Sequence, residues 1–198
     1  MRVLVVIDMQ NDFITGSLAN KEAEKIIPKI EEEINKLKSG DLLIFTRDTH
    51  EKDYLDTQEG EKLPVEHCIK GTDGWQICKN LKKYINNNYI EPDVITIDKY
   101  SFASLSNLRN YMRDEMDIVE TIDNYLFYNF MDLDAEELDE IALVGTCTDI
   151  CVISNAMVLK AAFPETPIKV ISEACAGTTP EHHKNAIEAM KMCQVDVI

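Results

Sequence analysis

The sequence predicts an α/β protein with a three-layer α/β/α architecture, in which a doubly wound, mostly parallel sheet of five to six strands lies between two layers of helices. Three observations predict it. Short continuous apolar runs recur along the chain, as strands buried on both faces require. Helical periods lie between these runs. No Gly/Ser-rich or Pro-rich linker divides the 198 residues, so we expect a single domain over residues 1–198.

The expected strands are apolar runs rich in β-branched residues, each ending at polar or special residues. In chain order they are Val3–Ile7, Leu42–Thr46, Val94–Ile97, Ile141–Val144, Ile168–Ile171 and a short Val195–Ile198.

The expected helices are bounded by proline, glycine and capping residues. The first follows the apolar period from Ile26 to Leu37, and Pro28 requires that this helix either starts near it or bends there. Gly40 is its expected C-terminal stop. Thr179 before Pro180 predicts the N-cap of the last helix, because proline fits the first helical position.

The segment at about 117–140 does not fit the alternation of strands and helices. It is rich in acidic residues and also carries tyrosine and phenylalanine. We expect an insertion with its own helix, which would cover the site or pack on another subunit.

Composition and charge exclude several classes of protein. A net charge of −16 would repel phosphate backbones, and no cluster of basic residues overcomes that field, so nucleic acid is not an expected partner. The apolar run Val3–Ile7 is too short for a signal peptide or a membrane span. We therefore expect a cytoplasmic protein without membrane association, whose six cysteines are reduced thiols.

Polar residues that follow the strands are the candidates for function, because ligands of doubly wound sheets bind beyond the carboxyl ends of the strands. Cys151 lies where the fourth strand turns through Gly145 into a helix. The helix macrodipole and free N–H groups there would favour a thiolate and could bind an oxyanion. The plainer alternative is a buried structural cysteine.

Asp48, His50 and His67 are candidate metal ligands. Alternate residues of an extended segment point the same way, so Asp48 and His50 could converge on one ion while His67 approaches from the next loop. A solvated loop with ordinary histidines is the alternative. The adjacent His182 and His183 near the start of the last helix are interpreted as solvent-facing, without a role.

Asp8 after the first strand, Lys99 after the third and Cys151 in a GxxTDxCV turn together resemble the catalytic triad of nicotinamidases and related isochorismatase-like cysteine hydrolases. The resemblance runs from the opening VLVVIDMQNDF to the closing strand, apart from the segment at about 117–140, and implies the isochorismatase-like hydrolase fold. It implies that Asp8 exchanges the proton of the Cys151 nucleophile and that Lys99 holds Asp8 in place. It also implies an oxyanion hole at the backbone N–H groups of Cys147 and Cys151, with a cis peptide between Thr146 and Cys147.

The resemblance extends to the metal. Residues 57–75 resemble the metal loop of metal-dependent nicotinamidases, with His67 as the distal histidine and with Glu59 or Glu61 as further candidate ligands. This favours a divalent ion, zinc first, with iron or manganese as alternatives. Such an ion would anchor the pyridine nitrogen of nicotinamide. Aromatic residues beside these motifs are the expected walls for a flat substrate ring: Phe13, Trp75, Phe102 and also Tyr100.

The expected function is that of a cysteine amidohydrolase in pyridine nucleotide metabolism, which cleaves nicotinamide or a similar small carboxamide to an acid and ammonia through a thioester. A hydrolase of carbamoyl or ureide compounds on the same scaffold and a non-catalytic binding protein remain the alternatives. Isochorismate cleavage is less favoured, because it needs neither a thiolate nor a metal anchor. The resemblance also implies a homo-oligomer.

Overall fold

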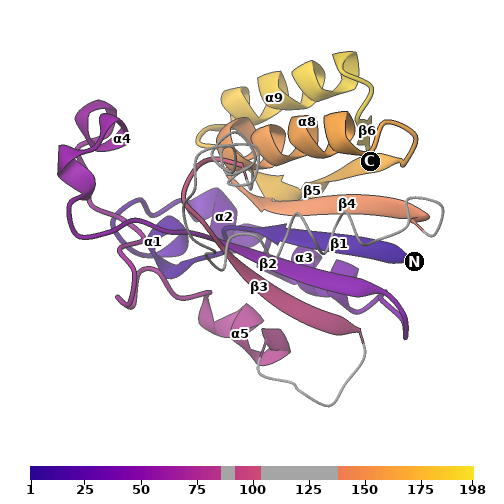
Figure 1. The fold of residues 1–198 in the computed structure, drawn as a ribbon, viewed down its shortest axis with the longest axis horizontal. Helices are drawn as coiled ribbons and strands as arrows, with labels where there is room; N and C mark the ends of the chain where they lie inside the picture. The colour runs from indigo at the N-terminus through magenta and orange to yellow at the C-terminus, as the bar shows by residue number, and fades with distance from the viewer. Residues whose placement is uncertain (86–91, 104–137) are drawn as a thin grey trace, which may run out of the picture.

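The computed structural model describes residues 1–85, 92–103 and 138–198. Six parallel strands form one twisted sheet in the order β3-β2-β1-β4-β5-β6 (Figure 1). The strands are β1 (Arg2–Ile7), β2 (Leu42–Asp48), β3 (Asp93–Lys99), β4 (Glu140–Thr146), β5 (Ile168–Ala176) and β6 (Asp196–Val197). This confirms the predicted doubly wound fold and all six predicted strands.

Helices cover both faces of the sheet, and each face has its own apolar core. One core joins β1 residues Leu4 and Val6 to helices α1, α2, α3 and α5, and the other joins Val3 and Val5 to helices α8 and α9. Helix α4 stands away from the sheet at the left of Figure 1. The helices are α1 (Asn11–Ile14), α2 (Lys21–Lys25), α3 (Ile27–Ile34), α4 (Gln58–Lys62), α5 (Lys79–Ile85), α8 (Ile153–Ala162) and α9 (Pro180–Met192).

The first predicted helix is shorter than its apolar period. Helix α3 begins at Ile27 with Pro28 in its first turn, so the helix starts at the proline. It ends at Ile34, and Asn35 is its C-cap. The predicted stop at Gly40 is therefore wrong: Gly40 has a φ of +85° and lies in the turn that leads into β2. At the other end of the chain, Thr179 caps α9 as predicted, since its side chain accepts a hydrogen bond from the His182 N–H.

The order of the strands creates a switch point between β1 and β4. From β1 the chain winds outward through β2 and β3, and from β4 it winds the other way through β5 and β6. The connections therefore leave these two neighbouring strands in opposite directions, and ligands of doubly wound sheets bind beyond the carboxyl ends of the strands at such a point. The predicted segment at about 117–140 falls mostly on residues outside the described ones and stays a prediction. Within the described ranges, no helix has the length and hydropathy needed to cross a membrane.

Candidate active site

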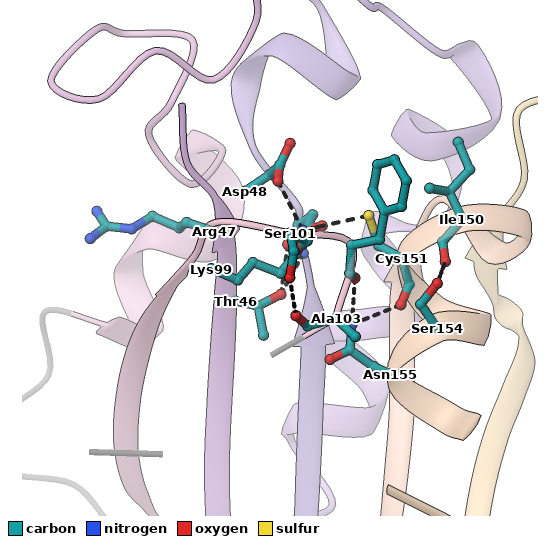
Figure 2. A network of polar contacts seen from close by, with 12 residues as sticks. Thr46, Arg47, Asp48, Lys99, Ser101, Ala103, Ile150, Cys151, Ser154 and Asn155 are labelled. Carbon is teal, nitrogen blue, oxygen red and sulfur yellow. Dashed lines mark hydrogen bonds and ion pairs between the residues drawn. The ribbon is translucent and has the colours of Figure 1, made fainter. Parts of the chain in front are cut away.

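The carboxyl ends of β1, β3 and β4 bring the three predicted reactive side chains together. Asp8 follows β1, Lys99 ends β3, and Cys151 lies in η3 (Thr148–Val152), the turn after β4. Lys99 Nζ lies 2.7 Å from Asp8 Oδ2 and 3.5 Å from Cys151 Sγ. Figure 2 shows that it also contacts Asp48, whose Oδ1 is 3.0 Å away. One ammonium therefore contacts two carboxylates and the thiol.

Burial decides where the protons of this cluster lie. The side chains of Asp8 and Lys99 are completely buried, and Cys151 is 5% exposed. Burial raises the pKa of the Cys151 thiol well above its usual value; Lys99 opposes this, and the carboxylates of Asp8 and Asp48 reinforce it. Burial also raises the pKa of Asp8, against the attraction of Lys99. We infer that at neutral pH the cluster holds a thiol, a carboxylate and an ammonium.

Cys151 lies in the first helical turn after β4, as predicted, but burial opposes the thiolate that this position was expected to favour. Residues Thr148–Val152 form a π-helical turn, and α8 begins only at Ile153. Burial and the neighbouring carboxylates raise the pKa of Cys151, and Lys99 lowers it. The reaction must then include a step that removes the proton from sulfur.

Backbone geometry and a hydroxyl hold Asp8 in position. Its φ is +47°, a conformation that aspartate tolerates better than most residues. The Thr46 hydroxyl donates to Asp8 Oδ1 at 2.7 Å and accepts from the Asp8 N–H at 3.1 Å. Next to it, Gly145 has a φ of +118°, and a Cβ there would meet the Ile7 carbonyl oxygen at 2.2 Å. Only glycine lets β4 approach β1 so closely beside Asp8.

A second cluster of ionisable side chains adjoins the first one through Asp48. Asp48, His50, Glu59 and His67 each offer one ligand atom, and these atoms all lie within 4.8 Å of one another. Asp48 Oδ2 is 3.1 Å from His50 Nε2 and 3.5 Å from His67 Nε2, while Glu59 Oε1 is 3.8 Å from His50 Nε2. The structure thus brings the three predicted ligands together and adds Glu59. The neighbouring Glu61 is exposed and outside the group.

Hydrogen bonds and packing orient the two histidines. His67 Nδ1 donates to the Val65 carbonyl oxygen at 2.8 Å, which leaves Nε2 as the nitrogen that can bind an ion. The buried ring of Tyr54 lies 4.6 Å from the His50 ring and 5.0 Å from the His67 ring. Two imidazoles and two carboxylates with this orientation fit a divalent transition-metal ion.

Gln10 holds the backbone of Asp48, the residue that the two clusters share, and was not singled out in the sequence. Its amide is fully buried, accepts from the Asp48 N–H at 2.7 Å, and donates to the carbonyl oxygens of Asp48 and Trp75 at 2.9 Å each. Both backbone groups of Asp48 are therefore fixed by one side chain. A glutamine two residues after a candidate acid is the only sequence signal for this role, and it does not reveal the partners.

Three of the four predicted aromatic residues lie in clearly different environments. Phe13 is buried, with its ring 5.7 Å from the His67 ring. Trp75 lies under the Arg47 guanidinium, 3.7 Å from the ring centroid, and its Nε1–H donates to the Thr49 hydroxyl at 2.9 Å. Phe102 is 47% exposed. Phe13 thus borders the candidate metal cluster, Trp75 already has polar partners, and Phe102 is the most accessible of the three.

The turn that carries Cys151 is fastened from two sides by residues without an assigned role in the sequence. Asn155 Nδ2 donates to the carbonyl oxygens of Cys151 and Phe102, at 2.7 and 3.1 Å. On the other side, His183 Nδ1 lies 2.9 Å from Thr148 Oγ1. The interpretation of His183 as solvent-facing is therefore wrong, whereas the side chain of His182 is 58% exposed. The peptide between Thr146 and Cys147 is cis, as the resemblance implied.

Fold and site define a doubly wound α/β protein whose switch point carries a thiol, a carboxylate and an ammonium in mutual contact. The family model described as the isochorismatase domain matches residues 2–117 and 132–198, so the chain belongs to the isochorismatase family.

Among curated relatives, the nicotinamidase of Schizosaccharomyces pombe is 23% identical over 221 residues, which cover 98% of this chain and 91% of the relative. The nicotinamidase of Escherichia coli is 26% identical over 209 residues, which cover 96% of this chain and 90% of the relative. Among solved structures, the pyrazinamidase of Pyrococcus horikoshii in complex with zinc has a TM-score of 0.70 at 24% identity. The match covers 100% of this chain and 98% of that structure.

Proposed function

We propose that the protein hydrolyses a small heteroaromatic carboxamide, nicotinamide first, to the acid and ammonia through a thioester on Cys151. The observation that carries this proposal is the contact of Lys99 with both Asp8 and Cys151 at the switch point of the sheet. The nicotinamidases of fission yeast and Escherichia coli, which match nearly the whole chain, support the choice of substrate.

Acylation follows from the protonation states of the resting site. As Cys151 Sγ attacks the amide carbon, its proton passes to Asp8, and the carbonyl oxygen becomes an oxyanion. We assign the oxyanion to the backbone N–H groups of Cys147 and Cys151; removing one such donor typically costs about 10²–10³ in rate. Asp8 then gives its proton to the amide nitrogen, the C–N bond breaks, and ammonia leaves with the acyl group on sulfur.

Deacylation reverses these roles. Asp8 takes a proton from water, the oxygen attacks the thioester carbon, and the same N–H groups stabilise the second oxyanion. The C–S bond then breaks, sulfur receives the proton held by Asp8, and the carboxylic acid leaves. Lys99 favours the charged form of Asp8 before each proton transfer, and its ion pair with Asp48 keeps the ammonium in place.

We further propose that Asp48, His50, Glu59 and His67 hold a divalent ion, zinc first, with iron or manganese as alternatives. The donor set and the spacing of its atoms support this assignment. When bound, the ion would supply a Lewis-acidic anchor for a ring nitrogen of the substrate. Phe13 would then lie against the substrate ring, since its own ring adjoins His67. Carbamoyl and ureide hydrolysis could use the same three reactive residues, but a ring-nitrogen anchor favours the heteroaromatic amide.

Ammonia release from nicotinamide by the wild type, Cys151→Ala and Cys193→Ala tests the reaction. Cys193 is an exposed thiol and serves as the control. We expect activity in the wild type and in Cys193→Ala and none above background in Cys151→Ala. Activity retained by Cys151→Ala would refute the nucleophile. A wild type that releases no ammonia from a panel of small amides with zinc, iron or manganese, although Cys151 can still be alkylated, would refute the amidase.

Metal content tests the second assignment. Glu59→Gln and Glu61→Gln are a matched pair, because the two residues lie in the same helix and only Glu59 faces the histidines. We expect zinc affinity to fall about 10–100-fold in Glu59→Gln, by analogy with changes around other metal sites, and to stay unchanged in Glu61→Gln. Equal zinc affinity in both variants would exclude Glu59 as a ligand.

A further inference from the structure

The turn that carries Cys151 is fastened to the start of α9 by two polar contacts and one close approach. His183 reaches from the first turns of α9 to Thr148, which is completely buried and lies three positions before the nucleophile. Its second ring nitrogen, Nε2, lies 3.2 Å from the Ser172 hydroxyl on β5. One imidazole therefore links the nucleophile turn to the neighbouring strand.

The second contact lies one residue further along the same turn. Asp149 Oδ1 accepts from the Thr178 N–H at 2.8 Å, and its Oδ2 accepts from the Thr178 hydroxyl at 2.5 Å. Gly177 lets the two segments come together, because a Cβ there would meet His183 Cβ at 2.8 Å and Asp149 Oδ1 at 2.9 Å. The loop between β5 and α9 thus supports the nucleophile turn from behind, outside the group of side chains that contact Lys99.

We propose that His183 is a positioning residue for Cys151: through Thr148, its imidazole fixes the turn that aims the sulfur at the substrate and presents the Cys147 and Cys151 N–H groups. The geometry points to this role because Thr148 and Cys151 lie in one short helical turn, so a shift of Thr148 moves the backbone of the nucleophile. A misplacement of about 1 Å can slow such reactions by about 10²-fold. The role of Cys151 itself rests on the proposed function.

The two nitrogens of His183 can be tested separately. The amide of asparagine occupies the place of imidazole Nδ1, so His183→Asn keeps a partner for Thr148 and loses the one for Ser172. The amide of glutamine reaches the place of Nε2, so His183→Gln keeps Ser172 and loses Thr148. Each variant loses one side-chain hydrogen bond, and their urea unfolding midpoints should fall by similar amounts. Lys184→Ala, at the next and exposed position of α9, is the control.

The measurement is the second-order rate of Cys151 alkylation by iodoacetamide, with the exposed Cys193 of the same molecule as internal reference, followed by peptide mass spectrometry. We expect His183→Gln to lower the rate ratio of Cys151 to Cys193 about five- to tenfold, the effect of about one hydrogen bond. His183→Asn and Lys184→Ala should stay within about twofold of the wild type. With nicotinamide, kcat should fall by the same factor in His183→Gln, while KM stays unchanged.

Thr148→Val removes the contact between Thr148 and His183 by deleting the hydroxyl. If His183→Gln does not fold, the alkylation rate of Cys151 is measured in Thr148→Val instead. The double variant His183→Gln/Thr148→Val should lose no more Cys151 reactivity than either single variant, because both changes remove the same contact between His183 and Thr148. Equal reactivity in His183→Gln and His183→Asn, or additive losses in the double variant, would overturn the proposal. If nicotinamide is not cleaved but alkylation follows the expected pattern, the positioning role stands and only the proposed function fails.

Discussion

Replacing Lys99 by methionine tests the buried cluster most directly, because the methionine side chain fills similar space without charge. The variant leaves the carboxylates of Asp8 and Asp48 buried without the ammonium that lies 2.7 and 3.0 Å from them. At an effective dielectric constant of about 20, each of these contacts corresponds to about 6 kcal/mol of attraction before desolvation is subtracted. Removing one partner of a buried ion pair costs about 3–5 kcal/mol in measured cases.

We therefore expect Lys99→Met to lower the free energy of unfolding by about 4 kcal/mol at pH 8. With a urea m-value of about 2 kcal/mol/M, the unfolding midpoint would fall by about 2 M. Lys83→Met is the matched control, because Lys83 pairs with Glu31 at 2.6 Å on the surface and its side chain is 60% exposed. Its midpoint should not change measurably. Both variants are compared with the wild type in EDTA, so that no ion compensates for the lost ammonium.

The effect of Lys99→Met should depend on pH. Burial already raises the pKa of Asp8, and Lys99 is the strongest influence that opposes this shift, so its loss should raise the pKa of Asp8 further. A carboxyl group whose pKa is higher in the folded than in the unfolded state stabilises the fold when it is protonated. This contribution is complete below the unfolded pKa of about 3.9 and is lost as pH rises through the folded pKa. The destabilisation should therefore be smaller at pH 5 than at pH 8. A midpoint at pH 8 equal to that of Lys83→Met would refute the buried ion pairs.

Three further predictions follow from single residues. Gln10→Glu can still accept from the Asp48 N–H but cannot donate to two carbonyl oxygens, so urea unfolding should show a loss of about 2–3 kcal/mol; an unchanged midpoint would contradict the link. Gly145→Ala combines a φ of +118° with a clash at 2.2 Å and should cost about 2–5 kcal/mol by the same measurement, whereas a loss below 1 kcal/mol would contradict the close approach. Burial raises the pKa of Cys175 to about 12. The causes of this shift include no carboxylate that could take the thiol proton, whereas Asp8 adjoins Cys151, so iodoacetamide should label Cys193 at pH 8 long before Cys175; equal labelling would contradict the burial.

Much of the fold could be predicted because its signals are local. Continuous apolar runs gave all six strands, since strands buried on both faces need no alternation. Pro28 and Thr179 marked helix starts, because each acts within its own helical turn. Gly40 misled because a glycine with positive φ serves a turn as well as a helix end, and the apolar period did not show that α3 would stop at Ile34.

By itself, the sequence determined which kinds of side chain follow which strands, and parallel strands necessarily bring those residues to one edge of the sheet. That was enough to gather Asp8, Lys99 and Cys151, because their placement depends only on strand order and position in the chain.

Tertiary structure decided what depends on distances between segments far apart in the sequence. It selected Glu59 over Glu61 as neighbour of the histidines, placed the Gln10 amide between Asp48 and Trp75, and turned His183 toward Thr148. It also set the direction in which the pKa of Cys151 is shifted, because the pKa of a group follows from its burial and from all the charges around it, and neither can be read from the neighbouring residues in the sequence.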